Sequence, residues 1–551
     1  NRSISQLIAL TPAPLAGVPM AVWRQGGVNT PFAADWDGSG FGGAQPSEPV
    51  GDYRIMQGAD APSRDEAIIV GVDADGTVSG ELWNGSSWTA LPALGAMSQT
   101  YWWGFDVAYE PVSGDAMVVY ADGANLNYRT WNGLSWSGEL PIPEATVGTP
   151  RQMQLAAHPY SDEMVLVVSD DASRDYAVVW DGAAWGNSQI LTADGSGNDR
   201  TDIDVVYEQK RGRAVVVFGT GTDDVHFRIW DAGWSNEFLT PGIGGGYSRW
   251  MVLGADPNSN NIVLGVLTND SDVWLAAWDD TGWINRTTAT TTSTGTTELA
   301  VAVGFEGSSG TAMAVYGESG SAPRYRTWVS GSGWSGATSI PSIGGTSNSL
   351  VLYPEPGTDG AMLAVNDDNV DSNDINYIYW NGSSWGTPSE LETISGETKN
   401  QPVLFLWPGA VGSAPSASTI SGRVFEDITG DLLTDGAIGD ANNPGSPGVD
   451  VYLYEDTDHN NALTVGVNDT LIAGPVATDA SGSYSFSGLP DDTYFVRVDS
   501  RTVPSAQDPA AIQGDVWATQ TYGPAGSACA DGSGSSPEIG AAGPCYGGVT
   551  G

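Results

Sequence analysis

The stretch Asn127-Tyr-Arg-Thr-Trp-Asn-Gly-Leu-Ser-Trp136 contains the pattern that decides the fold: a strand-like run, a tryptophan, a tight turn and a second aromatic residue. Eight copies occur within the first 385 residues, and successive first tryptophans lie 47 to 52 residues apart. A period of about 40 to 50 residues built from short strands is typical of β-propeller blades. The aromatic pairs are Trp36–Phe41, Trp83–Trp88, Trp131–Trp136, Trp180–Trp185, Trp230–Trp234, Trp278–Trp283, Trp328–Trp334 and Trp380–Trp385.

Each repeat unit reads as four strands. Two apolar runs, such as 202–207 and 214–218, precede an alternating strand that ends on the first tryptophan, and the second tryptophan opens the fourth strand. Asn-Gly or Asp-Gly in the turn tolerates the positive φ of a tight hairpin. The tryptophans are therefore expected to face each other across the hairpin or to pack between blades. Sugar stacking on exposed tryptophan faces is the alternative, but recurrence in every unit favours a structural role.

Counting the units predicts an all-β chain with an eight-bladed β-propeller over residues 17–409. The first unit has only three strands, and strand 402–407 has no blade after it, so pairing these two closes the ring and removes exposed sheet edges. A seven-bladed ring is the alternative. Residues 1–16 form an extended segment outside this count, which docks on the chain itself or adds a strand to a neighbouring subunit.

The charge balance narrows the class of partner. The chain carries 66 acidic and 20 basic residues, a formal net charge of −46. Such a field repels nucleic acid and anionic membrane surfaces, and it attracts cations such as Ca²⁺. Adaptation to a salty medium explains the same composition. No run of 18 apolar residues occurs, so we expect no membrane span in this segment.

A Pro/Gly/Ala/Ser-rich linker at 410–418 precedes a region of different composition. Residues 419–500 alternate as a small antiparallel β-sandwich would. Three motifs stand out: Gly422-Arg-Val-Phe-Glu-Asp427, Gly448-Val-Asp-Val-Tyr-Leu453 and Thr478-Asp-Ala-Ser-Gly-Ser-Tyr-Ser-Phe-Ser-Gly-Leu-Pro490. In these motifs the region resembles the B-type domains of bacterial surface adhesins, the serine-aspartate-repeat B-like and collagen-adhesin B-like families.

Acidic loops separate the strands of this region. Oxygen-bearing side chains at alternating positions can converge on one hard cation, and solvated acidic turns are the alternative. The resemblance to B-type domains implies that these loops bind structural Ca²⁺, although Ile428 and Thr429 depart from the usual pattern of the first loop. The candidate ligands are Asp456, Asp458, Asn460 and Asp469 in one loop and Asp427, Asp431, Asp435 and Asp440 in the other.

The tail, residues 501–551, contains the chain's two cysteines. A Cys529–Cys545 disulfide would suit an oxidising compartment, and two free thiols are the alternative. We therefore expect an extracellular or cell-surface location. We also expect the chain to be part of a larger exported protein that continues beyond residue 551.

Composition argues against catalysis. The three histidines, His158, His226 and His459, are scattered over different units, so no His-based catalytic or metal cluster is expected. The preferred interpretation is a non-catalytic structural subunit of a surface appendage, filament or adhesin stalk, which self-associates or binds neighbouring surface proteins. A glycan- or ligand-binding propeller is the alternative, and it predicts one blade face with exposed aromatics and with polar groups that differ from blade to blade. A glycoside hydrolase or lyase is the third candidate.

Overall fold

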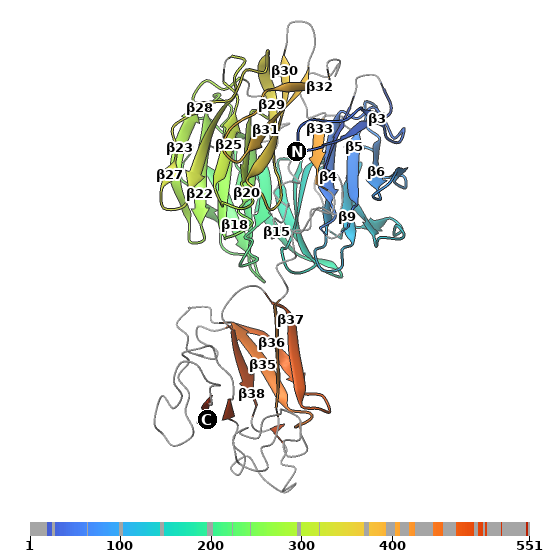
Figure 1. The fold of residues 1–551 in the computed structure, drawn as a ribbon, viewed down its shortest axis with the longest axis vertical. Helices are drawn as coiled ribbons and strands as arrows, with labels where there is room; N and C mark the ends of the chain where they lie inside the picture. The colour runs from blue at the N-terminus through green and yellow to red at the C-terminus, as the bar shows by residue number, and fades with distance from the viewer. Residues whose placement is uncertain are drawn as a thin grey trace. The chain divides into compact units, whose positions relative to one another are not determined.

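The computed structural model describes residues 19–24, 28–62, 64–97, 103–143, 148–195, 202–222, 224–242, 244–294, 299–318, 320–368, 374–392, 403–407, 418–424, 445–455, 470–489, 494–499, 502–503, 519–520 and 547–548. These residues form strands and turns without an α-helix (Figure 1). No described segment is therefore a helix long and apolar enough to cross a membrane. Internal contacts divide the chain into two compact units, residues 1–416 and 417–551.

Within its described residues, the first unit contains eight antiparallel sheets, numbered here in chain order. Sheet 1 contains β33 (Val403–Leu406), β1 (Met20–Trp23), β2 (Phe32–Asp35) and β3 (Gln45–Pro46). Sheet 2 contains β4 (Ile55–Asp60), β5 (Ala67–Val72), β6 (Val78–Trp83) and β7 (Trp88–Ala90). Sheet 3 contains β8 (Phe105–Tyr109), β9 (Ala116–Asp122), β10 (Asn125–Trp131) and β11 (Leu140–Pro141). Sheet 4 contains β12 (Pro150–Ala157), β13 (Glu163–Asp170), β14 (Asp175–Asp181) and β15 (Trp185–Thr192).

Sheets 5 to 8 follow the same order of strands. Sheet 5 contains β16 (Ile203–Tyr207), β17 (Ala214–Gly219), β18 (Val225–Trp230) and β19 (Phe238–Leu239). Sheet 6 contains β20 (Ser248–Ala255), β21 (Asn261–Thr268), β22 (Val273–Asp279) and β23 (Trp283–Thr290). Sheet 7 contains β24 (Val301–Phe305), β25 (Ala312–Tyr316), β26 (Arg324–Val329), β27 (Gly333–Trp334) and β28 (Thr338–Ser339). Sheet 8 contains β29 (Thr346–Pro354), β30 (Gly360–Asp368), β31 (Ile375–Asn381) and β32 (Ser389–Glu392).

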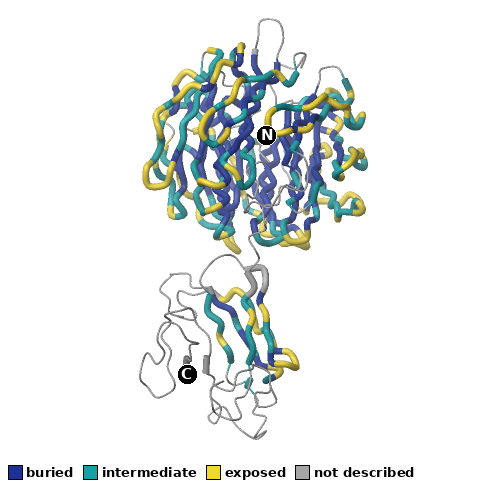
Figure 2. The backbone as a smooth tube through the Cα atoms, viewed as in Figure 1, coloured by how far each residue is buried: buried dark blue, intermediate teal, exposed yellow. Residues whose placement is uncertain are grey.

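Burial decreases from the first strand of each sheet to the last. All residues of β16 and β17 are buried, whereas both residues of β19 are exposed. Figure 2 shows buried stretches of the strands in dark blue and the exposed loops in yellow. The inner strands are near-continuous runs of Val, Ile, Ala and Phe because neighbouring sheets cover both of their faces. The outer strands mix polar residues with aromatics because one side faces solvent.

The sheets follow one another in a closed cycle. Each inner strand contacts the next along the series β33, β4, β8, β12, β16, β20, β24 and β29. The cycle closes where Tyr353 of β29 donates its hydroxyl to the Val403 carbonyl of β33 at 3.0 Å. In sheet 1, β33 pairs with β1 from Trp23↔Val403 to Met20↔Leu406. Sheets arranged in this way around a common axis constitute a β-propeller.

The aromatic pairs span the hairpin between the third and fourth strands. In seven of the eight pairs the ring centroids lie 5.0 to 5.6 Å apart. In the eighth, Trp328 and Trp334 stand opposite each other on β26 and β27. The turns at Gly133 and Gly182 have φ of 81° and 90°, which explains the Asn-Gly and Asp-Gly sequences there.

Two aspartates of the neighbouring sheets 4 and 5 are buried and repel each other electrostatically. Asp175 at the start of β14 is fully buried, and Asp202, just before β16, is 2 % exposed. Burial, together with the charges of Asp202 and Asp170, raises the pKa of Asp175 well above its ordinary value of 3.8, and Ser169 offsets this only in part. Ionising Asp175 therefore costs stability in the folded state.

Replacing Asp175 with asparagine should stabilise the protein at neutral pH, by about 1–3 kcal/mol. The folded protein binds this proton more tightly than the unfolded chain, so the free energy of unfolding falls as pH rises above about 4. Asp175→Asn has no such proton to lose, so its free energy of unfolding, measured with denaturant, should depend less on pH. Equal stability of both proteins at pH 4 and at pH 7 would contradict this account.

Among its described residues, the second unit has a two-stranded and a three-stranded antiparallel sheet. The first pairs β34 (Ser418–Arg423) with β37 (Ser483–Leu489), and the second has the order β36 (Thr470–Ala477), β35 (Asp450–Glu455), β38 (Tyr494–Val498). Buried Val451, Leu453 and Phe486 join side chains of both sheets in one apolar cluster. A two-stranded pair, β39 (Thr519–Gln520) and β40 (Gly547–Gly548), lies further along the chain.

Candidate functional site

Sheets 3 to 8 alternate in structure, so that the repeating unit is two sheets. An aromatic residue on the third strand of sheets 3, 5 and 7 packs against the tryptophan pair of the following sheet. Tyr128 lies 5.7 and 6.0 Å from Trp180 and Trp185. Phe227 and Tyr325 make the same contacts with Trp278–Trp283 and Trp380–Trp385. We call these contacts junctions 3/4, 5/6 and 7/8.

A glutamate connects the two sheets at each of these junctions. Glu110, Glu208 and Glu306 directly follow the first strand of sheets 3, 5 and 7 and are spaced 98 residues apart. Each accepts the indole N–H of the first tryptophan in the next sheet, at 2.7 Å from Trp180, 2.6 Å from Trp278 and 2.7 Å from Trp380. Burial raises the pKa of all three carboxyls.

Junctions 3/4 and 7/8 complete this scaffold in the same way. At junction 3/4, Ser113 donates its hydroxyl to Glu110, and the Asp162 carboxylate accepts the backbone N–H groups of Val112 and Ser113. At junction 7/8, Ser309 donates to Glu306, and Asp359 accepts from the N–H groups of Ser308 and Ser309. Neither loop has a basic residue of its own, although Arg64 of sheet 2 donates to the Gly114 carbonyl at junction 3/4 at 2.7 Å.

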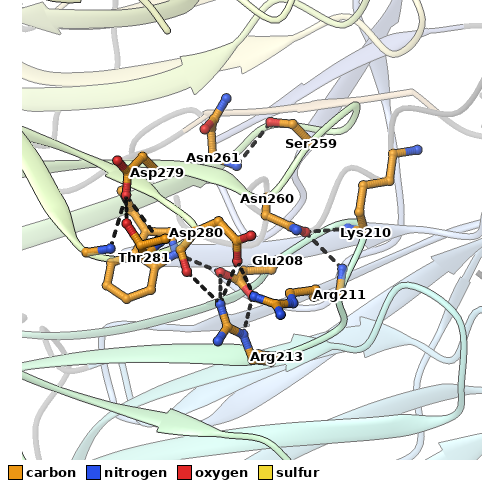
Figure 3. Close-up of polar contacts among 12 residues, drawn as sticks. Glu208, Lys210, Arg211, Arg213, Ser259, Asn260, Asn261, Asp279, Asp280 and Thr281 are labelled. Carbon is orange, nitrogen blue, oxygen red and sulfur yellow. Dashed lines mark hydrogen bonds and ion pairs between the residues drawn. The ribbon is translucent and has the colours of Figure 1, made fainter. Parts of the chain in front are cut away.

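Junction 5/6 has the same glutamate–tryptophan contact, but the side chains of its loop differ from those of the other two junctions (Figure 3). Asn260 accepts the backbone N–H groups of Lys210 and Arg211 at 3.0 and 2.8 Å, where the equivalent loops use an aspartate. Three positions of this loop are basic, whereas the same positions of the other two loops are not. Lys210 aligns with Val112 and Ser308, Arg211 with Ser113 and Ser309, and Arg213 with Asp115 and Thr311.

The new side chains form an ion-pair network. Arg213 binds Glu208 in a bidentate pair, with N–O distances of 2.6 and 2.8 Å, and its Nη2 also contacts Asp280 at 2.7 Å. Arg211 reaches the same Asp280 oxygen at 2.9 Å. The side chains of Arg211 and Asp280 are 35 % and 34 % exposed, whereas Glu208 is fully buried. Burial lowers the pKa of Arg213, but Glu208 and Asp280 outweigh it and raise that pKa above its ordinary value.

Asp280 occupies a backbone conformation that disfavours it. Its φ is 75°, and the equivalent turn positions are Gly182 and Gly382, with φ of 90° and 86°. A non-glycine residue in this region is strained by on the order of 1 kcal/mol. Two arginines on its carboxylate offset that cost. Five other described non-glycine residues also have a positive φ, including Ala232 in the equivalent turn of sheet 5, so it is the strained turn together with the ion-pair network that makes junction 5/6 the candidate site.

The exposed part of this network combines donors and acceptors. Arg211 donates, and Asp280 and Asp279 accept, while the Lys210 ammonium points away from the ion pairs in Figure 3. Hydrogen bonds from Thr281 lower the pKa of Asp279, so that this carboxylate is ionised at neutral pH. Such a surface suits a ligand whose neighbouring groups both donate and accept hydrogen bonds.

Most residues expected from the sequence to bind ligands lie outside the described residues. These are the candidate calcium ligands Asp427, Asp431, Asp435, Asp440, Asp456, Asp458, Asn460 and Asp469, and the cysteines Cys529 and Cys545. The described part of the chain contains no group of three His, Cys, Asp or Glu side chains placed to hold a metal ion.

The histidines that the structure describes have structural contacts. The ring of His158 packs edge-on against Tyr207 at 5.1 Å, and its Nδ1 accepts the N–H groups of Tyr160 and Ser161. Burial lowers its pKa to about 4. His226 pairs with Glu237 on sheet 5, and His459 lies outside the described residues.

The sequence matches no family model and no curated protein. Among solved structures, the chain is similar to the BP39L lectin from Burkholderia pseudomallei, with 13 % identity and a TM-score of 0.46 over 61 % of this chain and 98 % of that one. It is also similar to AofleA from Arthrobotrys oligospora (11 %, TM-score 0.36, 65 % and 90 %) and to a fucose-specific lectin from Aleuria aurantia (15 %, TM-score 0.32, 52 % and 94 %). At these values the similarity assigns neither a ligand nor a number of blades to this chain.

Proposed function

We propose that this chain is a non-catalytic, glycan-binding β-propeller and that junction 5/6 is its binding site. The observation that carries the proposal is the divergence of one junction from two that share its scaffold. A glycan-binding propeller is expected to have exposed aromatics on one blade face and polar groups that differ from blade to blade, and the residues at 210, 211, 213 and 280 supply the second of these features. Nothing in the described residues favours the filament subunit that we first preferred.

The chemistry of the junction supports a carbohydrate ligand. Adjacent sugar hydroxyls both donate and accept hydrogen bonds, and Arg211 beside Asp280 offers both functions within one patch. Planar arginine and carboxylate groups give such contacts a fixed geometry. The fully buried Glu208, paired with the largely buried Arg213, holds the patch rigid, so little order has to be imposed when a ligand binds.

The test replaces residues of junction 5/6 by those at the same positions of junctions 3/4 and 7/8. Arg211→Ser together with Asp280→Gly introduces the serine and glycine of junctions 3/4 and 7/8, relieves the strained turn and leaves the net charge unchanged. On a glycan array and by calorimetry, the full chain should bind a carbohydrate and the double variant should bind it at least tenfold more weakly. Ser309→Ala at junction 7/8 is the control and should bind normally. A full chain that binds no glycan would disprove the proposed function.

The architecture belongs to the same proposal. We infer an eight-bladed ring, supported by the eight described sheets and by the contacts that link β29 to β33 and β33 to β4. We also infer that the second unit is a B-type β-sandwich of an extracellular protein, supported by the apolar cluster common to its two sheets.

For the second unit we propose structural Ca²⁺ bound by its acidic loops. Carboxylates brought together in a loop repel one another unless a cation neutralises them. Removing Ca²⁺ with a chelator should therefore lower the unfolding temperature of the second unit by several degrees and leave the propeller transition in place. Calorimetry of the full chain with and without chelator separates the two transitions. An unchanged second transition would mean that no structural Ca²⁺ is bound there.

A further inference from the structure

Two hairpin turns of the propeller present an asparagine in a setting that suits covalent modification. Asn84 of sheet 2 and Asn381 of sheet 8 directly follow the first tryptophan of an aromatic pair, and both residues are exposed. Each begins the sequence Asn-Gly-Ser. An asparagine followed two positions later by serine or threonine, with any residue except proline between them, is the acceptor motif for N-linked glycosylation of exported proteins.

Both turns hold the acceptor in the same conformation. The Oδ1 of Asn84 accepts the backbone N–H of Ser86 at 3.1 Å and its hydroxyl at 2.9 Å. The Oδ1 of Asn381 accepts the same two groups of Ser383 at 3.0 and 2.9 Å. Neither Nδ2 has a hydrogen-bond partner among the described residues. The hydroxyl of the motif therefore contacts the amide oxygen, and the amide nitrogen, which would receive the sugar, stays available.

The structure separates these two asparagines from two others with the same motif, Asn269 and Asn285. Asn269 accepts the backbone N–H of Tyr247 at 2.8 Å, so its side chain joins two segments of sheet 6. Asn285 accepts the indole N–H of Trp328 at 2.9 Å and so connects sheets 6 and 7. A Cβ on Gly333 would meet the Nδ2 of Asn285 at 3.6 Å, so the chain approaches that nitrogen closely. A bulky glycan on either amide would disturb these contacts.

The two exposed motifs lie beside the sheet in which the ring closes. Sheet 1 contacts sheet 2 through β33 and β4, and it contacts sheet 8 through the hydrogen bond from Tyr353 to Val403. The hairpins that border junction 5/6, residues 230–234 and 278–283, contain no asparagine. Glycans on sheets 2 and 8 would therefore flank the closing sheet and leave the candidate binding site uncovered.

We propose that Asn84 and Asn381 are N-glycosylated and that Asn269 and Asn285 are not. This inference goes beyond glycan binding and rests on the extracellular location inferred for the chain. In the reaction, Nδ2 forms a bond to the anomeric carbon of an oligosaccharide carried on a lipid diphosphate. The bond from that carbon to the diphosphate oxygen breaks, the lipid diphosphate leaves and the nitrogen loses one proton to solvent. No atom changes its oxidation state overall, so no oxidant or reductant is needed.

The experiment maps glycopeptides of the full chain, recovered from outside the cells that produce it. Mass spectrometry of intact peptides should find glycans on Asn84 and Asn381 and none on Asn132, Asn269 or Asn285. Asn132 is the built-in control, because it occupies the same exposed turn in sheet 3 but has Leu two positions later. An exported chain without a glycan on Asn84 and Asn381 would overturn the proposal. A glycan on Asn269 or Asn285 would overturn the distinction drawn between the motifs.

Three variants test the motif itself. Ser86→Ala removes one hydroxyl but keeps the backbone of the turn, so Asn84 should lose its glycan while Asn381 keeps its own. Ser86→Thr retains a hydroxyl and should retain the glycan. Leu134→Ser completes the motif in the turn of sheet 3, so Asn132 should gain a glycan. A glycan on Asn84 that survives Ser86→Ala, or an unmodified Asn132 after Leu134→Ser, would mean that the exposed motif does not determine the modification.

Discussion

Replacing Trp180 with alanine should destabilise the propeller by about 3–5 kcal/mol. Its ring packs against Trp185 at 5.6 Å and Tyr128 at 5.7 Å, so truncation leaves a cavity between sheets 3 and 4. It also removes the N–H that the buried Glu110 accepts. Trp180→Phe retains most of the packing and should isolate the loss of that hydrogen bond, about 1–3 kcal/mol. Denaturant-induced unfolding, followed by tryptophan fluorescence, measures both.

The equivalent change at junction 5/6 provides the control. Trp278→Phe removes the same N–H from Glu208, but Glu208 keeps its bidentate pair with Arg213. Trp278→Phe should therefore cost less than Trp180→Phe. Equal losses at the two junctions would mean that the hydrogen bond to glutamate contributes nothing beyond ring packing.

Arg213→Ala should cost about 3–5 kcal/mol at neutral pH, because it leaves the fully buried Glu208 without its cation. Without Arg213 the pKa of Glu208, already raised by burial, rises further. The folded state then binds a proton more tightly than the unfolded chain does. The loss of stability should therefore be small near pH 4 and should grow as pH rises above the ordinary glutamate value of 4.5.

A second substitution separates charge from packing in this prediction. Glu208→Gln combined with Arg213→Ala removes both charges, keeps an acceptor for Trp278 and should recover part of the lost stability. It should also remove the pH dependence. A single Arg213→Ala variant that loses stability equally at every pH would show that the arginine acts through packing alone.

The sequence predicts the sheets well because their cause is local. A tryptophan, a tight turn and a second aromatic residue lie within five to seven positions, and each of the eight copies forms a hairpin. Spacing alone also separates the propeller strands from the later region, since the pattern stops after Trp385.

The two-sheet repeat and the site were missed for different reasons. The 98-residue spacing of Glu110, Glu208 and Glu306 is visible in the sequence, but in a chain with 66 acidic residues three carboxylates do not stand out. Asp280 follows another aspartate in a turn where any polar residue is ordinary, and only its φ reveals the strain. Lys210, Arg211 and Arg213 become informative once the structure aligns their loop with two equivalents that lack a cation. The expected calcium loops lie outside the described residues and remain predictions.

The pairing of β33 with β1 also has a consequence for synthesis of the chain. Met20 and Leu406, partners in one sheet, are separated by 386 residues. At about 5–20 residues per second, a ribosome needs on the order of 20–80 s to make that interval. Throughout this time β1, whose four residues are all buried in the finished ring, has an apolar edge with no partner strand. Nascent chains on one messenger are therefore at risk of pairing with each other through β1, and a holding chaperone that covers this edge would raise the yield of closed rings.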